Sequence, residues 1–204
     1  APSAIPYAHD WHVPTALDQG GIERVTAAFV SAAERAARVG FDFVEIHGAH
    51  GYLLHQFLSP LANQRTDHYG GPLENRMRFP IEVFEAVRAA VPAGVPVGVR
   101  VSATDWVDGG WDIAQTIAFA NALKARGVDW IDVSSGGVSP LQKIALGPGY
   151  QVPFAEAVRK ATGLPTMAVG LITEAQQAED IVASGKADMI ALARGMLYDP
   201  RWTW

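Results

Sequence analysis

Apolar residues along most of the chain follow two alternating patterns. Between residues 21 and 38 they recur about every 3.6 positions, which is the period of a helix with one face in a core. Short runs such as 130–133 are almost continuously apolar instead, as is typical of parallel strands buried on both faces. Together the two patterns predict strands over 43–46, 95–101, 130–133, 166–170 and 189–193, and helices over 21–38, 73–91, 113–126, 154–161 and 174–184.

Strands that alternate with helices predict an α/β fold, either an open doubly wound sheet or a (β/α)8 TIM barrel. The barrel is favoured because no glycine-rich dinucleotide fingerprint follows a strand, and because polar residues gather after the C-terminal ends of several strands. In a barrel those ends share one opening, where active sites are built. We therefore expect a TIM barrel of which this chain holds about strands 4–8, because a closed barrel needs eight strands and about 250 residues.

The predicted domain organisation is a single partial barrel over residues 1–204, with a loop at 1–20 and the βα units at 21–204. Both ends of the sequence look cut, so we expect the native protein to be longer. A barrel that lacks three strands exposes two sheet edges, which are sites of association or aggregation. A non-catalytic fragment that pairs with a complementary chain through these edges is therefore one alternative.

Composition narrows the range of functions. A chain of 204 residues that is 49% hydrophobic and 18% charged is not intrinsically disordered. Its net charge of −5 without a basic cluster argues against nucleic acid as a partner, and no run of about 20 apolar residues predicts a membrane span. The lack of cysteine excludes disulfides and thiolate metal sites. We expect a protein of the cytoplasm.

The densest group of chemically useful side chains follows the first predicted strand. His47 ends that strand, and His50 and Tyr52 come from the glycine-containing loop after it. Two imidazoles and a phenol can hydrogen-bond one substrate oxygen and supply a proton. Ordinary polar residues at a strand end explain the pattern equally well. A metal-dependent hydrolase that uses both histidines and Glu45 is a weaker alternative, since the better-known zinc pair lies four residues apart with a glutamate between.

Arg100 interrupts the apolar strand over 95–101. Its alternating neighbours Gly98 and Ser102 indicate that the side chain points into the barrel or its mouth. A buried guanidinium needs an anionic or acceptor-rich partner. An ion pair with Glu45 on the adjacent strand and a bound anion are both open at this point.

Gly170 and Arg194 follow the last two predicted strands. A glycine at a strand end lets backbone N–H groups approach a phosphate, and an arginine beside it adds a bidentate contact. The loops after the last two strands of a barrel are a frequent phosphate site. The pair therefore indicates phosphate binding.

Longer motifs run through almost the whole chain in a fixed order. They lie at 45–53 (EIHGAHGYL), 57–60 (FLSP), 63–71 (NQRTDHYGG), 74–79 (ENRMRF), 99–103 (VRVSA), 134–136 (SSG), 169–172 (VGLI) and 192–194 (LAR). In this order they resemble the Old Yellow Enzyme family of flavin-dependent ene-reductases. The His-x-x-His spacing is most similar to the bacterial thermophilic-like subgroup of that family.

The resemblance implies a (β/α)8 barrel with FMN bound non-covalently at its mouth and no metal. NADPH or NADH would reduce the flavin, and a hydride would then pass to the C=C bond of an α,β-unsaturated carbonyl or nitro compound. The partners implied are small activated alkenes and, for the full-length protein, further copies of itself in a homo-oligomer.

The same resemblance implies roles for individual residues. His47 and His50 would hold the substrate oxygen, Tyr52 would donate a proton to the α-carbon, and Arg100 would lie against the N1/O2 edge of the flavin. The phosphate would be bound by residues at the last two strand ends, namely Gly170, Ala193 and Arg194. Ala193 stands where the family usually has glycine.

One further enzyme class competes with this interpretation. A phosphate-binding barrel lyase or isomerase would use Gly170 and Arg194 for a substrate phosphate. His47 and Tyr52 would then act as its acid and base. Such an enzyme would carry no flavin, so the purified protein would have no yellow colour.

Overall fold

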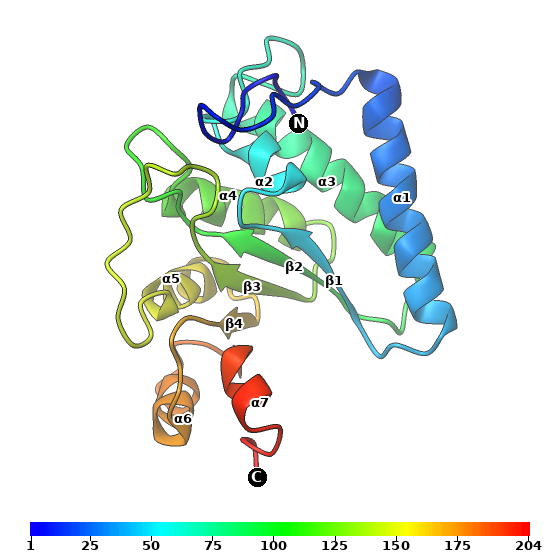
Figure 1. Ribbon diagram of the computed structural model, residues 1–204. Coiled ribbons are helices and arrows are strands. Elements are labelled where there is room, and N and C mark those ends of the chain that lie inside the picture. The colour runs from blue at the N-terminus through cyan, green and yellow to red at the C-terminus, as the bar shows by residue number, and fades with distance from the viewer.

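The computed structural model describes residues 1–204 and contains one parallel sheet with the strand order β1-β2-β3-β4-β5 (Figure 1). Each strand after β1 pairs with the strand before it in the sequence, and right-handed crossovers in this order place the connecting helices on the same face of the sheet. The strands are β1 (Val44–Gly48), β2 (Val97–Ser102), β3 (Trp130–Ser134), β4 (Thr166–Ala168) and β5 (Met189–Ile190). The predicted α/β class with a parallel sheet is confirmed.

Seven helices precede, connect or follow the strands, and α1, α3, α4 and α5 pack against one another around the sheet (Figure 1). The helices are α1 (Gln19–Arg38), α2 (Leu53–Leu58), α3 (Leu73–Ala90), α4 (Ile113–Lys124), α5 (Val152–Thr162), α6 (Ala175–Ala183) and α7 (Arg194–Tyr198). Side-chain caps mark the beginnings of α1 and α4, since Asp18 accepts a hydrogen bond from the Gly21 N–H and Asp112 accepts one from the Gln115 N–H. None of the helices combines the length and apolar character that crossing a bilayer requires.

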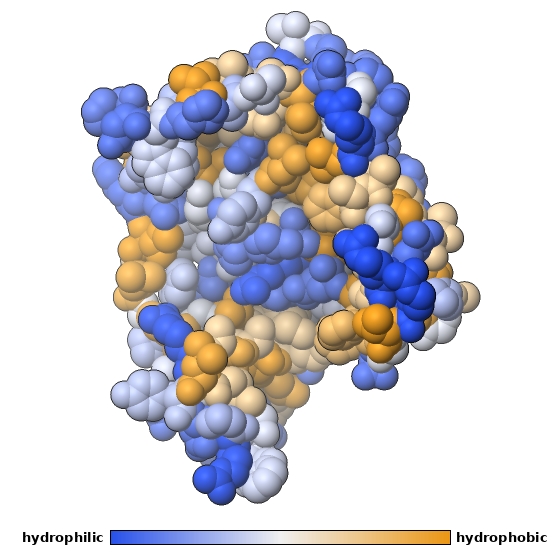
Figure 2. All heavy atoms as spheres, turned by 45° about the vertical axis from the view of Figure 1, so that its right-hand side comes forward, coloured by the Kyte–Doolittle hydropathy of each residue, from blue (hydrophilic) through white to orange (hydrophobic).

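Alternation along β2 separates the core from the functional face. Val97, Val99 and Val101 are buried in the hydrophobic core that the sheet shares with the helices. Arg100 lies between them in sequence and therefore points to the opposite face of the sheet. Figure 2 shows a hydrophilic area in the middle of one side of the molecule, with hydrophobic side chains above and below it.

The last two strands are shorter than predicted. β4 ends at Ala168, because the next two carbonyls bond outside the sheet: the Val169 carbonyl accepts a hydrogen bond from the Gln151 side chain, and the Gly170 carbonyl accepts a backbone hydrogen bond from the Gly149 N–H. β5 is the last strand of the sheet and has a neighbour on one side only. The short helices α2 and α7 were not predicted, because one or two turns are too few to reveal a helical period.

Candidate active site

The register of the sheet places three polar residues in one row. His47 on β1 is the partner of Arg100 on β2, and Arg100 is the partner of Asp132 on β3. Because paired residues of parallel strands present their side chains to the same face, the three side chains share one side of the sheet. The row lies near the C-terminal ends of the strands, as predicted for His47 and Arg100.

The turn after β1 is held against the loop after β3. The His50 N–H donates to Ser102 Oγ over 2.9 Å, and the Ser102 hydroxyl donates to the Gly136 carbonyl over 2.8 Å. Gly137 packs so closely on the His50 backbone that a Cβ at this glycine would overlap it. His50 itself has a φ of 59°, a left-handed conformation that is uncommon without glycine and that recurs at functional sites.

This turn brings the predicted substrate residues together. The ring centroids of His47 and His50 lie 5.1 Å apart, and those of His47 and Tyr52 lie 5.3 Å apart. Tyr52 is the N-cap of α2 and is 63% exposed, so its hydroxyl is open to a ligand. The predicted grouping of two imidazoles and a phenol is therefore present in the structure.

Both imidazoles are neutral at pH 7. Burial, followed by the charge of Arg100, lowers the pKa of His50 to about 4. The same two causes lower the pKa of His47. A neutral imidazole has one N–H donor and one acceptor nitrogen, so each ring can donate a single hydrogen bond to a substrate oxygen.

Arg100 has a different ion-pair partner from the one that the sequence suggested. Its Nε lies 3.2 Å from Asp132 Oδ2, and the Asp132 side chain is only 3% exposed. Glu45 instead accepts a hydrogen bond from Trp130 Nε1 over 3.1 Å. That contact passes over Gly98, where a Cβ would overlap the indole. The alternative of an Arg100–Glu45 ion pair is therefore wrong, because the Glu45 carboxylate is hydrogen-bonded to the Trp130 indole instead.

The guanidinium keeps most of its donor capacity. Arg100 donates no hydrogen bond within the chain, and its side chain is 27% exposed. Burial and the nearby Glu45 carboxylate raise the pKa of Asp132 to about 7, although Arg100 opposes the shift. A carboxylate that is partly protonated at neutral pH cancels only part of the arginine charge. The exposed part of the Arg100 guanidinium can therefore bind an anion.

The predicted phosphate residues line a separate hollow of about 780 Å³ at the ends of β4 and β5. Gly170 and Leu171 have φ values of 119° and 51°, and the N–H groups of Gly170, Leu171 and Ala193 make no backbone hydrogen bond. Successive N–H groups in such conformations form concavities that bind anions. Arg194 lines the same hollow and is exposed. The structure thus brings Gly170, Ala193 and Arg194 together.

Gln151 joins the two parts of the site and was missed in the sequence. Its Oε1 accepts from Ser135 Oγ over 2.6 Å, and its Nε2 donates to the Val169 carbonyl over 3.1 Å. A Cβ at Gly170 would lie 2.7 Å from the same amide nitrogen. Nothing in the spacing of a lone glutamine before a helix indicates this role.

His55 does not belong to the histidine group, although it lies in the same motif. Its Nδ1 accepts from the Gly51 N–H, and its Nε2 lies 2.9 Å from Asp105 Oδ1, with both side chains fully buried. Asp105 also accepts from the Ser59 hydroxyl and the Trp111 N–H. This buried network supports the turn that carries His50 and Tyr52. No group of three histidine or carboxylate side chains converges on a metal-binding position, so His47, His50 and Glu45 do not form the alternative metal site.

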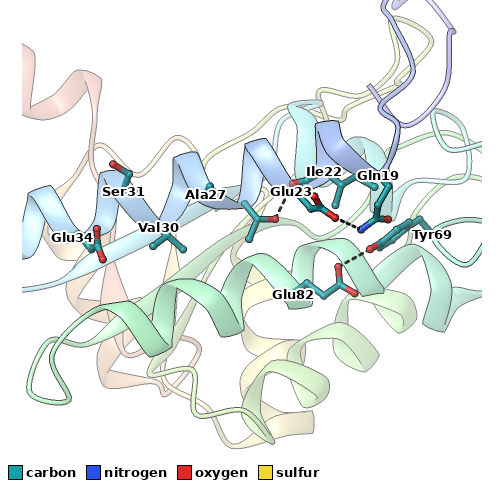
Figure 3. Close-up of a pocket in the computed structure, with 10 residues that line it drawn as sticks. Gln19, Ile22, Glu23, Ala27, Val30, Ser31, Glu34, Tyr69 and Glu82 are labelled. Carbon is teal, nitrogen blue, oxygen red and sulfur yellow. Dashed lines mark hydrogen bonds between the residues drawn. The ribbon is translucent and has the colours of Figure 1, made fainter.

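A second hollow, of about 470 Å³, lies between α1 and α3 (Figure 3). Glu23, Glu34 and Glu82 line it, and the Tyr69 hydroxyl donates to Glu82 Oε2 over 3.0 Å. Three carboxylates repel a phosphate or carboxylate ligand. The strand-end residues therefore form the candidate site.

Comparison with known proteins identifies the family of the chain. A model of the NADH:flavin oxidoreductase / NADH oxidase family matches residues 3–204. The chain belongs to this family. It is a family of flavin oxidoreductases, so the predicted family is confirmed, and the FMN cofactor and the oxidoreductase class of that family agree with the prediction.

Individual relatives show how much of a family member is present. The chain is 48% identical over 204 residues to an NADPH dehydrogenase of Geobacillus sp. (strain WCH70) and 50% identical over 201 residues to one of Bacillus licheniformis. These matches cover 100% and 98% of this chain but 59% and 58% of the relatives. The chain therefore spans less than two thirds of the length of the curated relatives it matches.

Solved structures of similar proteins match the whole arrangement of elements. Morphinone reductase in complex with tetrahydroNAD is 29% identical, with a TM-score of 0.82, over 100% of this chain and 57% of that one. A 2-naphthoyl-CoA reductase complex with 2-naphthoyl-CoA is also 29% identical, with a TM-score of 0.90, over 98% of this chain and 31% of that one.

The residues of this family member fit FMN at two places. Arg100 is a half-buried cation that makes one ion pair, with Asp132, and donates no hydrogen bond within the chain, so its free N–H groups can bind an electron-rich ring edge. At β4 and β5, Gly170 and Ala193 offer unpaired N–H groups beside the Arg194 charge, which suits a terminal phosphate.

Proposed function

We propose that this chain forms about strands 4–8 of a (β/α)8 barrel, as one partial-barrel domain over residues 1–204, and that the whole protein is an FMN-dependent ene-reductase. The substrates would be α,β-unsaturated carbonyl or nitro compounds, with NADPH or NADH as reductant. One observation carries the proposal: two neutral imidazoles lie beside a guanidinium that is paired only with Asp132 and donates no hydrogen bond within the chain. A carbonyl-polarising pair next to an anion-binding cation suits a flavin enzyme that acts on conjugated alkenes.

Cofactor binding would divide between the two ends of the site. Arg100 would contact the N1/O2 edge of the isoalloxazine, where its charge favours the reduced, anionic ring. Gly170, Ala193 and Arg194 would hold the phosphate. When bound, FMN supplies two-electron transfer between the nicotinamide and the alkene.

The substrate side would use groups on the turn after β1. His47 and His50 would each donate one N–H to the carbonyl or nitro oxygen, which withdraws electrons from the conjugated C=C bond. Tyr52 would deliver a proton to the α-carbon from its exposed hydroxyl. Because both imidazoles are neutral, they bind the oxygen without competing with Tyr52 as stronger acids.

The remaining features of the whole protein follow from the same proposal. The edges of β1 and β5 would pair with the other strands of the barrel, and exposed aromatic side chains such as Phe41 and Phe43 would be covered. Homo-oligomerisation and a cytoplasmic location stay predictions. Membership of the flavin family disfavours both a lyase or isomerase and a purely non-catalytic fragment.

An absorbance spectrum of the purified full-length protein tests the proposal. We expect a flavin spectrum, FMN in the supernatant after denaturation, and loss of the visible band on anaerobic addition of NADPH or NADH. The band should return on addition of an enone or a nitroalkene. A protein without flavin, or a reduced flavin that no activated alkene reoxidises, would contradict it.

A further inference from the structure

The Ser134 hydroxyl lies between His50 and Gln151 at the end of β3. It is 2.6 Å from His50 Nε2 and 3.3 Å from Gln151 Oε1, and Ser134 is 4% exposed. A hydroxyl carries one proton, so it can donate to only one of these two acceptors. The choice decides which nitrogen of the neutral His50 ring bears a hydrogen.

The distances and the neighbouring bonds favour donation to His50. Hydrogen bonds between a hydroxyl and an oxygen span about 2.5–3.0 Å, so the contact with Gln151 is too long and the contact with His50 is not. Gln151 Oε1 already accepts from Ser135 Oγ at 2.6 Å, and Ser135 in turn accepts from Trp106 Nε1. Gln151 Nε2 donates to Val169, which fixes the orientation of the amide. The Ser134 proton is therefore directed to the imidazole.

We propose that Ser134 is a positioning residue that sets the tautomer of His50, by donating to Nε2 so that Nδ1 carries the ring proton. Nδ1 makes no hydrogen bond within the chain, so its N–H is the one that His50 can offer to a ligand. The identity of that ligand, a substrate oxygen, rests on the proposed function. The Ser102 hydroxyl, which binds the His50 N–H, holds the backbone while Ser134 sets the ring.

A neutron crystal structure of the FMN-loaded full-length protein tests the tautomer directly. We expect deuterium on His50 Nδ1 and on Ser134 Oγ, with the latter pointing to Nε2. Deuterium on Nε2, with the serine hydroxyl turned to Gln151, would overturn the proposal. This readout does not depend on the substrate of the enzyme.

A binding experiment tests the consequence in the same full-length protein. Ser134→Ala should weaken 4-nitrophenol binding about three- to tenfold, the range for one net hydrogen bond, and Ser134→Thr should restore most of it. Ser139→Ala is the matched control, since Ser139 lies in the loop after β3 and its hydroxyl accepts a hydrogen bond from the Leu141 N–H alone, and this variant should bind like the wild type.

The outcomes separate this inference from the proposed function. Equal affinity of the wild type and Ser134→Ala for 4-nitrophenol would overturn the role of Ser134. A wild-type holoenzyme that binds no phenol would overturn the proposed substrate site instead, and the neutron map would then decide the tautomer alone.

Discussion

The two ends of the candidate site are built differently. At β1–β3, all five residues of β3 are buried, and the turn with His50 is tied to Ser102 and, through Gly51, to His55. At β4 and β5, the strands have three and two residues, and α7 has no buried residue. The chain therefore preorganises the substrate end by its own contacts, whereas the phosphate end consists of open backbone groups and an exposed arginine. The conformation of the first end should therefore stay the same when FMN is removed, whereas the conformation of the second end should depend on bound FMN.

The largest effect should come from breaking the buried support of the first end. Asp105→Ala removes the acceptor of His55, Ser59 and Trp111, and should lower the free energy of unfolding by about 3 kcal/mol or more, as for other broken buried pairs. Arg194→Ala, at the exposed second end, should change it by less than about 0.5 kcal/mol. Urea unfolding of the full-length protein without FMN measures both. Equal losses in the two variants would remove the contrast between the ends.

A change in Tyr52 should separate chemistry from stability within the first end. Its hydroxyl makes no hydrogen bond in the chain and is exposed, so Tyr52→Phe should leave the free energy of unfolding nearly unchanged. Alkene reduction should slow about 10²-fold through loss of the proton donor, while flavin reduction by NADPH should not. Stopped-flow measurement of the two half-reactions checks this. Equal slowing of both steps would mean that Tyr52 is not the proton donor.

Substitution of the two arginines should rank the ends by their contribution to FMN binding. Arg100→Met removes a half-buried charge and leaves Asp132 buried without a cation, so FMN affinity should fall by about thirtyfold or more. Arg194→Ala removes an exposed contact, and affinity should fall by about tenfold at most. Flavin fluorescence titration of the apoprotein gives both constants. A larger loss in Arg194→Ala would place the dominant cofactor contact at the second end.

A further difference should appear in the pH dependence of stability, and it should come from the first end. The pKa of His50, about 4, lies below its unfolded value, so this group destabilises the fold as the pH falls from 6.5 towards 4. The pKa of Asp132, about 7, lies above its unfolded value, so its contribution is fully present below pH 3.8 and is lost as the pH rises through 7. The two contributions oppose each other.

Single substitutions should expose each contribution. Relative to the wild type, His50→Gln should become more stable as the pH falls from 6.5 to 4.5, and Asp132→Asn should become more stable as the pH rises from 4.5 to 7.5. Urea unfolding at these pH values gives both slopes. Slopes of the same sign would contradict the opposed shifts.

The strands, the long helices and the grouping of His47, His50 and Tyr52 could be predicted from the sequence, because periodicity and strand-end position are local properties. The ion-pair partner of Arg100 could not. The Trp130 indole can hydrogen-bond Glu45 only because Gly98, on the strand between them, has no side chain. Such a contact depends on the register of three strands, which the sequence does not show. Gln151 was missed for the same reason, since its bonds join segments that lie far apart in the sequence.

The central claim is that the imidazole pair and Arg100 converge on one bound flavin and its ligand. A crystal structure of the full-length protein with FMN and 4-nitrophenol tests it most directly. The account predicts the phenol oxygen within hydrogen-bond distance of both His47 and His50, over a flavin whose N1/O2 edge contacts Arg100. A flavin bound elsewhere, or a phenol held by neither histidine, would contradict the account.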